Sequence, residues 1–197
     1  MSAAVRAVED RWAEIRFEMK ASKAQKIAAS QALVTTAKAL AGAYPDRAEP
    51  IVWHAMAVLV EAEVRHDTVA LGLAKDARRL LERAEAIDVK AFDGMIQTIL
   101  GMLYFEVPGW PLGFGDKKRA EKYLQQALEI DPANTDNNYF YGDFLLRTGR
   151  AVAALPYLER AGEMTIRPDH ERADKGRMTE VQESLAKARL AASRKVR

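Results

Sequence analysis

Histidines are the first residues to examine for metal or acid–base chemistry, and the chain has three of them: His54, His66 and His170. None lies in a His-Glu-x-x-His frame, and none has another histidine four residues away on the same helix face. Because the chain contains no cysteine, a zinc site would need His66, Asp67 and His170 to converge from distant segments. We therefore expect no metal site, and we interpret the histidines as structural or surface residues.

Carboxylates and nucleophiles also fail to form a catalytic set. The pairs Glu61/Glu63 and Glu9/Asp10 are close in sequence, so their side chains diverge around a helix rather than meeting as an acid and a base. A cysteine nucleophile is excluded by composition. No nucleophile with a base and a group to orient that base is apparent, and we expect a protein that is not an enzyme.

The segment 109–115 is rich in glycine and precedes a predicted helix, as phosphate-binding loops do. A helix N-terminus favours an anion. However, proline and tryptophan replace the free N–H groups that a phosphate needs, and Asp116 would repel phosphate. We interpret the segment as a structured loop in which Trp110 and Phe114 pack against helix faces, with contact to a ligand as the alternative. No cofactor is expected.

The elements that position these residues are helical from end to end, because apolar residues recur with the helical period and proline and glycine fall at the breaks. The pattern predicts helices over 3–20, 23–42, 48–65, 67–87, 90–106, 116–130, 134–147, 150–163 and 169–193. We group them as one domain, 1–197, with pairs at about 3–42, 48–87, 90–130 and 134–163 and a capping helix at 169–193. Asp116, and either Asn134 or Thr135, are expected to cap helices.

Small residues recur at fixed spacing within these predicted pairs. In the pair 134–163, Gly142 is followed by Ala154 and then, seven residues later, by Ala161. The seven-residue spacing of alanines occurs in the other pairs too, at Ala120/Ala127, Ala77/Ala84 and Ala32/Ala39. Small residues let two helices approach closely, and a larger side chain there would overpack the contact.

The sequence resembles the tetratricopeptide repeat (TPR) pattern at residues 117–132 and 138–150 and at the positions Ala154, Leu158, Ala161 and Pro168. The resemblance is strongest over 117–168, moderate over 48–132 and weakest over the first pair. It implies an all-α, right-handed TPR-like solenoid of about four helix pairs plus a C-terminal capping helix, with a concave binding face. Two departures indicate a divergent member: 19 residues separate Gly101 from Ala120, and 20 separate Ala57 from Ala77, where 12 separate Gly142 from Ala154.

A narrower resemblance comes from the run 107–116 followed by the repeat at 117–132. A Gly-Asp loop leading into such a helix is similar to bacterial TPR proteins associated with TRAP-type solute transporters, and the segment 172–178 is similar to related exported TPR proteins. The resemblance implies a protein that is exported, often lipid-anchored, and paired with a periplasmic solute-binding protein. The anchoring signal of that group is a lipobox cysteine, and the sequence given contains none.

The TPR resemblance also nominates binding residues, because the first helix of each pair lines the concave face. We expect these groove positions to be Asp136, Tyr139, Asp143 and Arg147 in the fourth pair, Thr98, Met102 and Glu106 in the third, and His54 and Glu61 in the second. Such a mixture suits a peptide or protein ligand. The alternative is that a solvated helix face carries these residues by default. Trp53, Tyr104, Leu145 and Leu158 are expected in the core.

Bulk composition limits the partners. A net charge of +2 over 197 residues gives no argument for nucleic acid, and no apolar run approaches the ~20 residues of a membrane span. The residues given carry no secretory signal pattern, but a signal removed on export would leave the same sequence, so cytosol and periplasm both stay open.

We conclude from the sequence that the protein is a non-catalytic scaffold that binds a protein or peptide. The alternative is an accessory component of bacterial solute transport that binds a small molecule or a solute-binding protein. The amphipathic last helix could instead mediate self-association.

Overall fold

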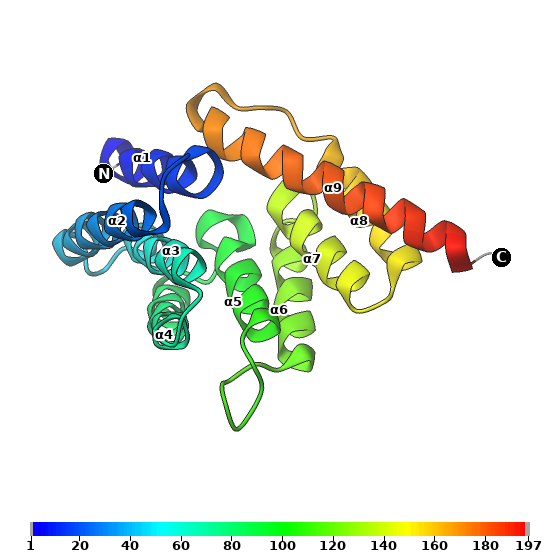
Figure 1. Cartoon of the computed structure of the whole chain (residues 1–197), viewed down its shortest axis with the longest axis horizontal. Helices are drawn as coiled ribbons and strands as arrows, with labels where there is room; N and C mark the ends of the chain where they lie inside the picture. Colours follow the sequence, from blue (N-terminus) through cyan, green and yellow to red (C-terminus); the bar gives the residue numbers. More distant parts are fainter. Residues whose placement is uncertain (1, 196–197) are drawn as a thin grey trace. The chain divides into compact units, whose positions relative to one another are not determined.

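The helices arise where the sequence has helical period and end where proline, glycine or a capping side chain stops them. The computed structural model describes the backbone of residues 2–195 and the side chains of 3–194. Over that range it is all-α (Figure 1), and the chain divides into two compact units, residues 1–92 with 110–113 and residues 93–109 with 114–197.

The first unit holds four α-helices within the described residues. They are α1 (Ser2–Ala13), which continues into a π-helical turn (Glu14–Glu18), α2 (Lys23–Ala43), α3 (Ala48–Arg65) and α4 (Ala70–Ile87). Helix α3 is central to their packing, because α2 and α4 both lie along it. Helix α1 contacts α2 and α3 about equally, and the ring centroids of Trp12 and Trp53 lie 5.9 Å apart, edge to face.

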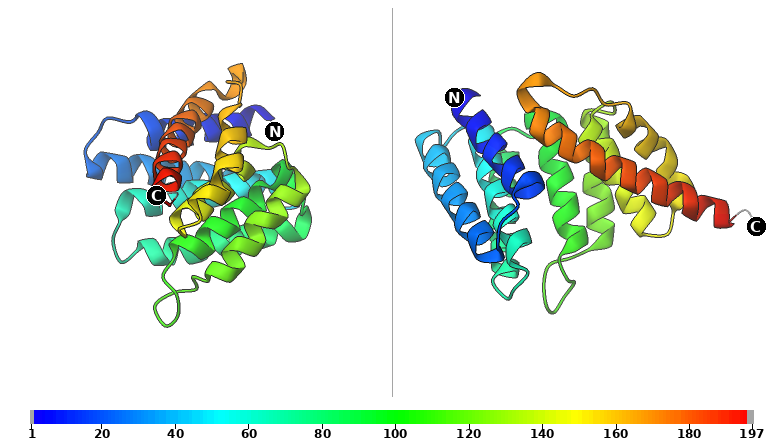
Figure 2. Two further views of the ribbon diagram at one scale, coloured as in Figure 1. Left: turned by 90° about the vertical axis from the view of Figure 1, so that its right-hand side faces the viewer. Right: turned by 45° about the horizontal axis from the view of Figure 1, so that its top comes forward.

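The second unit contains α5 (Met95–Glu106), α6 (Lys117–Ile130), α7 (Thr135–Arg147), α8 (Ala151–Gly162) and α9 (Glu171–Lys195). Helices α5 and α6 form one antiparallel pair and α7 and α8 the next, and the long helix α9 packs on α8 and also contacts α7. Figure 2 shows α9 lying across this second pair. The prediction of an all-α chain of paired helices with a long C-terminal helix is confirmed.

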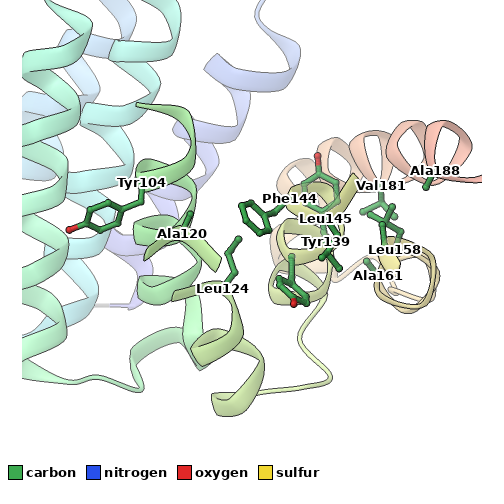
Figure 3. Packing of buried hydrophobic residues seen from close by; sticks show 12 residues of the cluster. Tyr104, Ala120, Leu124, Tyr139, Phe144, Leu145, Leu158, Ala161, Val181 and Ala188 are labelled. Atoms are coloured by element: carbon green, nitrogen blue, oxygen red, sulfur yellow. The ribbon is translucent and has the colours of Figure 1, made fainter. Parts of the chain in front are cut away.

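Close approach within each pair of the second unit depends on glycine facing leucine. A Cβ added to Gly142 would lie 2.7 Å from Leu158 Cγ, and one added to Gly101 would lie 2.7 Å from Leu124 Cγ. Both leucines are fully buried, and Figure 3 shows them within the apolar cluster of the unit. The alanines at the predicted small positions of α6 and α8 are also fully buried: Ala120, Ala127, Ala154 and Ala161. The predicted close packing of these pairs is therefore confirmed, as is the burial of the expected core residues Trp53, Tyr104, Leu145 and Leu158.

Capping side chains begin α6 and α7, as the sequence predicted. Asp116 accepts hydrogen bonds from the backbone N–H groups of Lys118 and Arg119, at 2.9 and 3.1 Å. Asn134, rather than Thr135, caps α7 by accepting from the backbone N–H groups of the second and third residues after it. These bonds satisfy N–H groups that have no partner inside the helix.

The largest departure from the predicted helix boundaries lies before α5. The helix expected over 90–106 begins only at Met95, because Phe92, Asp93 and Gly94 all have positive φ (55°, 53° and 95°). Gly94 is also tightly enclosed, since a Cβ there would lie 2.9 Å from the carbonyl oxygen of Ala127. Only glycine meets both requirements without strain.

Candidate functional site

The groove face predicted on α7 lies largely under α9. Asp136 Oδ1 accepts a 2.6 Å hydrogen bond from Arg177 Nε, and Asp143 Oδ1 accepts a 3.2 Å bond from Ser184 Oγ. Tyr139, between them in sequence, is 8% exposed. Three of the four predicted α7 residues therefore contact the last helix of the protein itself.

Arg177 is the main link between α9 and α7, and the sequence did not single out this role. Its guanidinium carbon lies 4.8 Å from the ring centroid of Tyr139 and 4.3 Å from that of Phe140, so the cation is held over two aromatic faces. It also pairs with Glu180 one turn further along α9. Asp174, on the same helix, instead binds Arg167, at 2.7 Å.

Burial under α9 shifts the ionisation of the α7 residues. Loss of water around Tyr139 raises the pKa of its phenol to about 12. Burial also raises the pKa of the Asp143 carboxyl, an effect that the nearby Arg147 cation and the Ser184 hydroxyl partly oppose. Neither group is placed for acid–base work on a dissolved substrate, since both face α9.

Glu106 and Arg147 are predicted residues of the second unit that are exposed to solvent. They form a two-armed ion pair between α5 and α7, with side chains 49% and 42% exposed. The guanidinium carbon of Arg147 lies 4.5 Å from the ring centroid of Phe105, and its second partner is Asp143, at 3.4 Å. Glu106 raises the pKa of Arg147 by accepting its hydrogen bonds, and the pair forms a charged patch beside an aromatic ring.

The other two α5 candidates turn inward to different extents. Met102 is half-buried, whereas Thr98 is 1% exposed and donates a 2.8 Å hydrogen bond to Asn137 Oδ1. Asn137 was not predicted as important, yet its amide nitrogen lies within 3.1 Å of the carbonyl oxygens of Asp93, Ala127 and Asp131. This buried amide ties the start of α7 to the end of α6 and to the turn before α5.

The two candidates in the first unit lie on α3. His54 is half-buried, and burial together with the positive charge of Lys38 lowers the pKa of its imidazole. Glu61 is 6% exposed and forms a 2.8 Å ion pair with Arg65 one turn along the same helix. Both side chains are therefore held mainly by their own unit.

The loop between α5 and α6 is ordered by its base and exposed at its tip. Asp116 N–H donates to the carbonyl oxygen of Tyr104 at 2.8 Å, and the Phe114 ring packs edge-on against the Tyr104 ring at 5.6 Å. The expected packing of Phe114 is thus confirmed. The same expectation for Trp110 is wrong, because Gly109 and Gly115 pair with each other and leave Trp110 at the tip, 89% exposed.

A cleft of about 390 Å³ in the first unit was not predicted at all. Its lining combines basic side chains with an apolar floor: Ile15, Arg16, Ala21, Lys23, Lys26, Val60, Glu63, Val64 and His66. Arg16 Nε and Glu63 form a 3.1 Å ion pair there. The residues come from three separate helical segments, which is why no local motif reveals them.

Two kinds of site are missing from the part of the chain that the structure describes. Residues 3–194 contain no group of three or more histidine, aspartate or glutamate side chains able to hold a metal ion. Within residues 2–195, no helix is both long and apolar enough to cross a bilayer.

Comparison with known proteins supports the fold. The sequence model of the tetratricopeptide repeat matches residues 112–172. Among solved structures, a thermophilic TPR protein of Thermus thermophilus is similar with a TM-score of 0.64 and 18% identity, over 84% of this chain and 76% of that one. Two structures of MamA protein align with TM-scores of 0.43 and 0.44, at 19% and 20% identity, over 100% and 86% of this chain and 96% and 92% of theirs. No curated protein matches the sequence.

The matched segment begins in the loop before α6 and runs through α7 and α8 to the start of α9, which are the helices with the small-residue contacts described above. The sequence match, the paired helices and the similar TPR structure agree with the resemblance drawn from residues 117–168. Residues 112–172 thus match the tetratricopeptide repeat, and the chain has a TPR-like fold.

Proposed function

We propose that this protein is a non-catalytic scaffold that binds a protein or peptide partner beside the Glu106–Arg147 pair. The TPR fold generally serves protein–protein interaction. The observation that carries the proposal is a preformed, half-exposed ion pair that joins two first helices and lies against the ring of Phe105. Arginine and aromatic side chains are enriched among residues that dominate binding energy, and a preformed pair loses little conformational entropy on binding.

The remaining predicted groove residues have graded roles in this proposal. Asp143 borders the patch through its contact with Arg147, and Met102 is half-buried one turn before Glu106 on α5. Asp136 and Tyr139 act through α9, since both are engaged by Arg177. Thr98 acts by holding Asn137, and His54 and Glu61 belong to the separate unit around α3.

A charge exchange tests the proposal while preserving the fold. The double variant Glu106→Arg/Arg147→Glu keeps an ion pair between α5 and α7 but reverses the charge that each position offers to a partner. We expect its melting temperature to fall modestly, because the exposed pair contributes only about 0–1 kcal/mol but the exchange places a carboxylate near Asp143. A partner captured from native lysate by the wild type should be lost.

The matched control is Glu159→Arg/Arg189→Glu, which exchanges another exposed pair, at 3.1 Å, in the same unit. This control should retain every partner. If the Glu106/Arg147 exchange variant captures the same proteins as the wild type with unchanged affinity, the proposed site is wrong.

A second candidate function is binding of a small anionic molecule, as an accessory component of bacterial solute transport. It is supported by the cleft in the first unit, where Lys23, Lys26 and His66 surround an apolar floor. A ligand that binds only the folded state raises the melting temperature. We expect small carboxylates or phosphates to raise it for the wild type and not for Lys23→Glu/Lys26→Glu; equal responses would exclude the cleft.

A further inference from the structure

The tip of the loop at 107–116 carries the two most exposed large apolar side chains among the described residues. Trp110 is 89% exposed and Leu112 is 72% exposed. The other exposed large apolar residues range from 40% to 57%. Scattered apolar residues are normal on a protein surface, but two largely exposed ones on either side of Pro111 indicate an interaction site.

The loop presents these side chains on a defined base. The backbone N–H of Gly115 donates to the carbonyl oxygen of Pro108 at 2.9 Å, and the Phe114 ring is held against Tyr104. The loop therefore needs little additional ordering when its tip binds, which lowers the entropic cost of association. A disordered loop would offer the same residues less effectively.

The charges that follow the loop are mostly basic. Residues 107–122 contain four cations (Lys117, Lys118, Arg119 and Lys122) and two carboxylates (Asp116 and Glu121). Both carboxylates are already engaged, Asp116 as the cap of α6 and Glu121 in a 2.6 Å ion pair with Arg150. Within the residues that the structure describes, Lys117 and Lys118 form no ion pair and are exposed.

We propose that this loop docks the protein on an anionic lipid surface, with Trp110 and Leu112 inserted at the interface and Lys117 and Lys118 on the headgroups. Tryptophan is favoured at the membrane–water interface because its ring is apolar and its N–H is polar. Lysine and arginine near the surface add attraction to anionic lipids. This peripheral contact involves no membrane span and is independent of the partner site at Glu106 and Arg147.

Intrinsic fluorescence tests insertion directly, because the chain has three tryptophans and the other two are buried. Vesicles of phosphatidylcholine and phosphatidylglycerol in equal parts should shift the emission of Trp110 to the blue, and brominated lipids should quench it. Vesicles of phosphatidylcholine alone should do so much less. Trp110→Phe should abolish the shift while keeping an apolar side chain at the tip.

Vesicle sedimentation gives the magnitude. Trp110→Ala/Leu112→Ala should lower partitioning at least about tenfold, and each of Lys117→Gln and Lys118→Gln about fivefold. The control Val152→Ala/Leu190→Ala removes two other exposed apolar side chains, 57% and 56% exposed, and should bind normally. Unchanged binding of the tip variant, or equal binding to neutral and anionic vesicles, would overturn the proposal.

A protein pocket is the competing occupant of the loop tip. In that case the wild-type protein would bind neither type of vesicle. A partner protein captured by the wild type would be lost by Trp110→Ala/Leu112→Ala and retained by Glu106→Arg/Arg147→Glu. That result would also overturn the lipid proposal and leave the proposed function untouched. If only the Glu106→Arg/Arg147→Glu variant loses partner binding, the result bears on the proposed function and not on the lipid proposal.

Discussion

Gly142 should tolerate no side chain, and Gly142→Ala measures how closely α7 and α8 pack. The added Cβ would lie 2.7 Å from Leu158 Cγ and 2.9 Å from Leu158 Cδ2. Carbon atoms prefer separations of about 3.5–4.0 Å, so Leu158 or α8 must move by about 1 Å. Leu158 is fully buried, and such overpacking costs about 1–3 kcal/mol.

Helix propensity acts in the opposite direction, so a matched control is needed. Replacing glycine by alanine in a helix stabilises it by up to about 1 kcal/mol. Gly72 in α4 has no atom within 4 Å of an added Cβ, so Gly72→Ala includes the propensity gain without the clash. Gly142→Ala should therefore be less stable than Gly72→Ala by about 1–3 kcal/mol.

A double-mutant cycle then assigns the penalty to Leu158. In a Leu158→Ala background the clashing atoms are gone, so Gly142→Ala should cost nothing or become stabilising. Urea unfolding gives the free energies, and each kcal/mol should appear as about 2–4 °C in a thermal melt. If Gly142→Ala is as stable as Gly72→Ala, or if its penalty persists without the Leu158 side chain, the close-packing argument fails. Gly142→Leu should be more harmful than Gly142→Ala.

Three further predictions concern side chains that the structure places at junctions. Arg177→Met should destabilise the protein by about 1–3 kcal/mol and expose α9 to protease, whereas Arg189→Met, which breaks an exposed pair, should cost about 0–1 kcal/mol; equal effects would show that α9 does not depend on Arg177. Asn137→Leu should cost about 1–3 kcal/mol or more, because it removes the acceptor of the buried Thr98 hydroxyl and the amide that bridges three carbonyl oxygens; a neutral result in urea unfolding would contradict the tie between α6 and α7. Burial lowers the pKa of His54 in the folded state. The stability that its neutral form contributes is therefore complete above the unfolded pKa of about 6.5. That contribution is lost as the pH falls through the folded pKa. The urea midpoint of the wild type should therefore fall more between pH 7 and 5 than that of His54→Gln, and parallel curves would contradict this sign.

The sequence predicts most of the fold because its signals are local. The glycine–alanine spacing from Gly142 to Ala154 and the cap at Asp116 depend on neighbours within one helix pair, and the structure confirms both. The sequence did not reveal that the predicted groove residues of α7 are covered, because the cover is α9. Arg177 reaches Asp136 across 41 residues, and no short pattern links the two. The expected packing of Trp110 failed because the pairing of Gly109 with Gly115 decides where the tip points.

One repeating offset explains why α9 covers the predicted groove face of α7. The bonds Arg147–Glu106, Arg177–Asp136 and Ser184–Asp143 each join residues 41 apart. Helix α9 therefore contacts α7 as α7 contacts α5, and it takes the place of a first helix in a further repeat. The positions that helical spacing selects on α5 and α7 therefore contact the following first helix, α7 or α9, as well as solvent.

The same offset accounts for the outer face of α9. Gly101 and Gly142 are 41 residues apart, and each receives the leucine of its second helix. The next position in this series is Glu183, which is exposed and lies 3.9 Å from Lys187 across one turn. A charged residue is tolerated at this position because it faces solvent. Helix α9 therefore covers the groove face of α7 with Arg177 and Ser184, while Glu106 and Arg147 keep their solvent access.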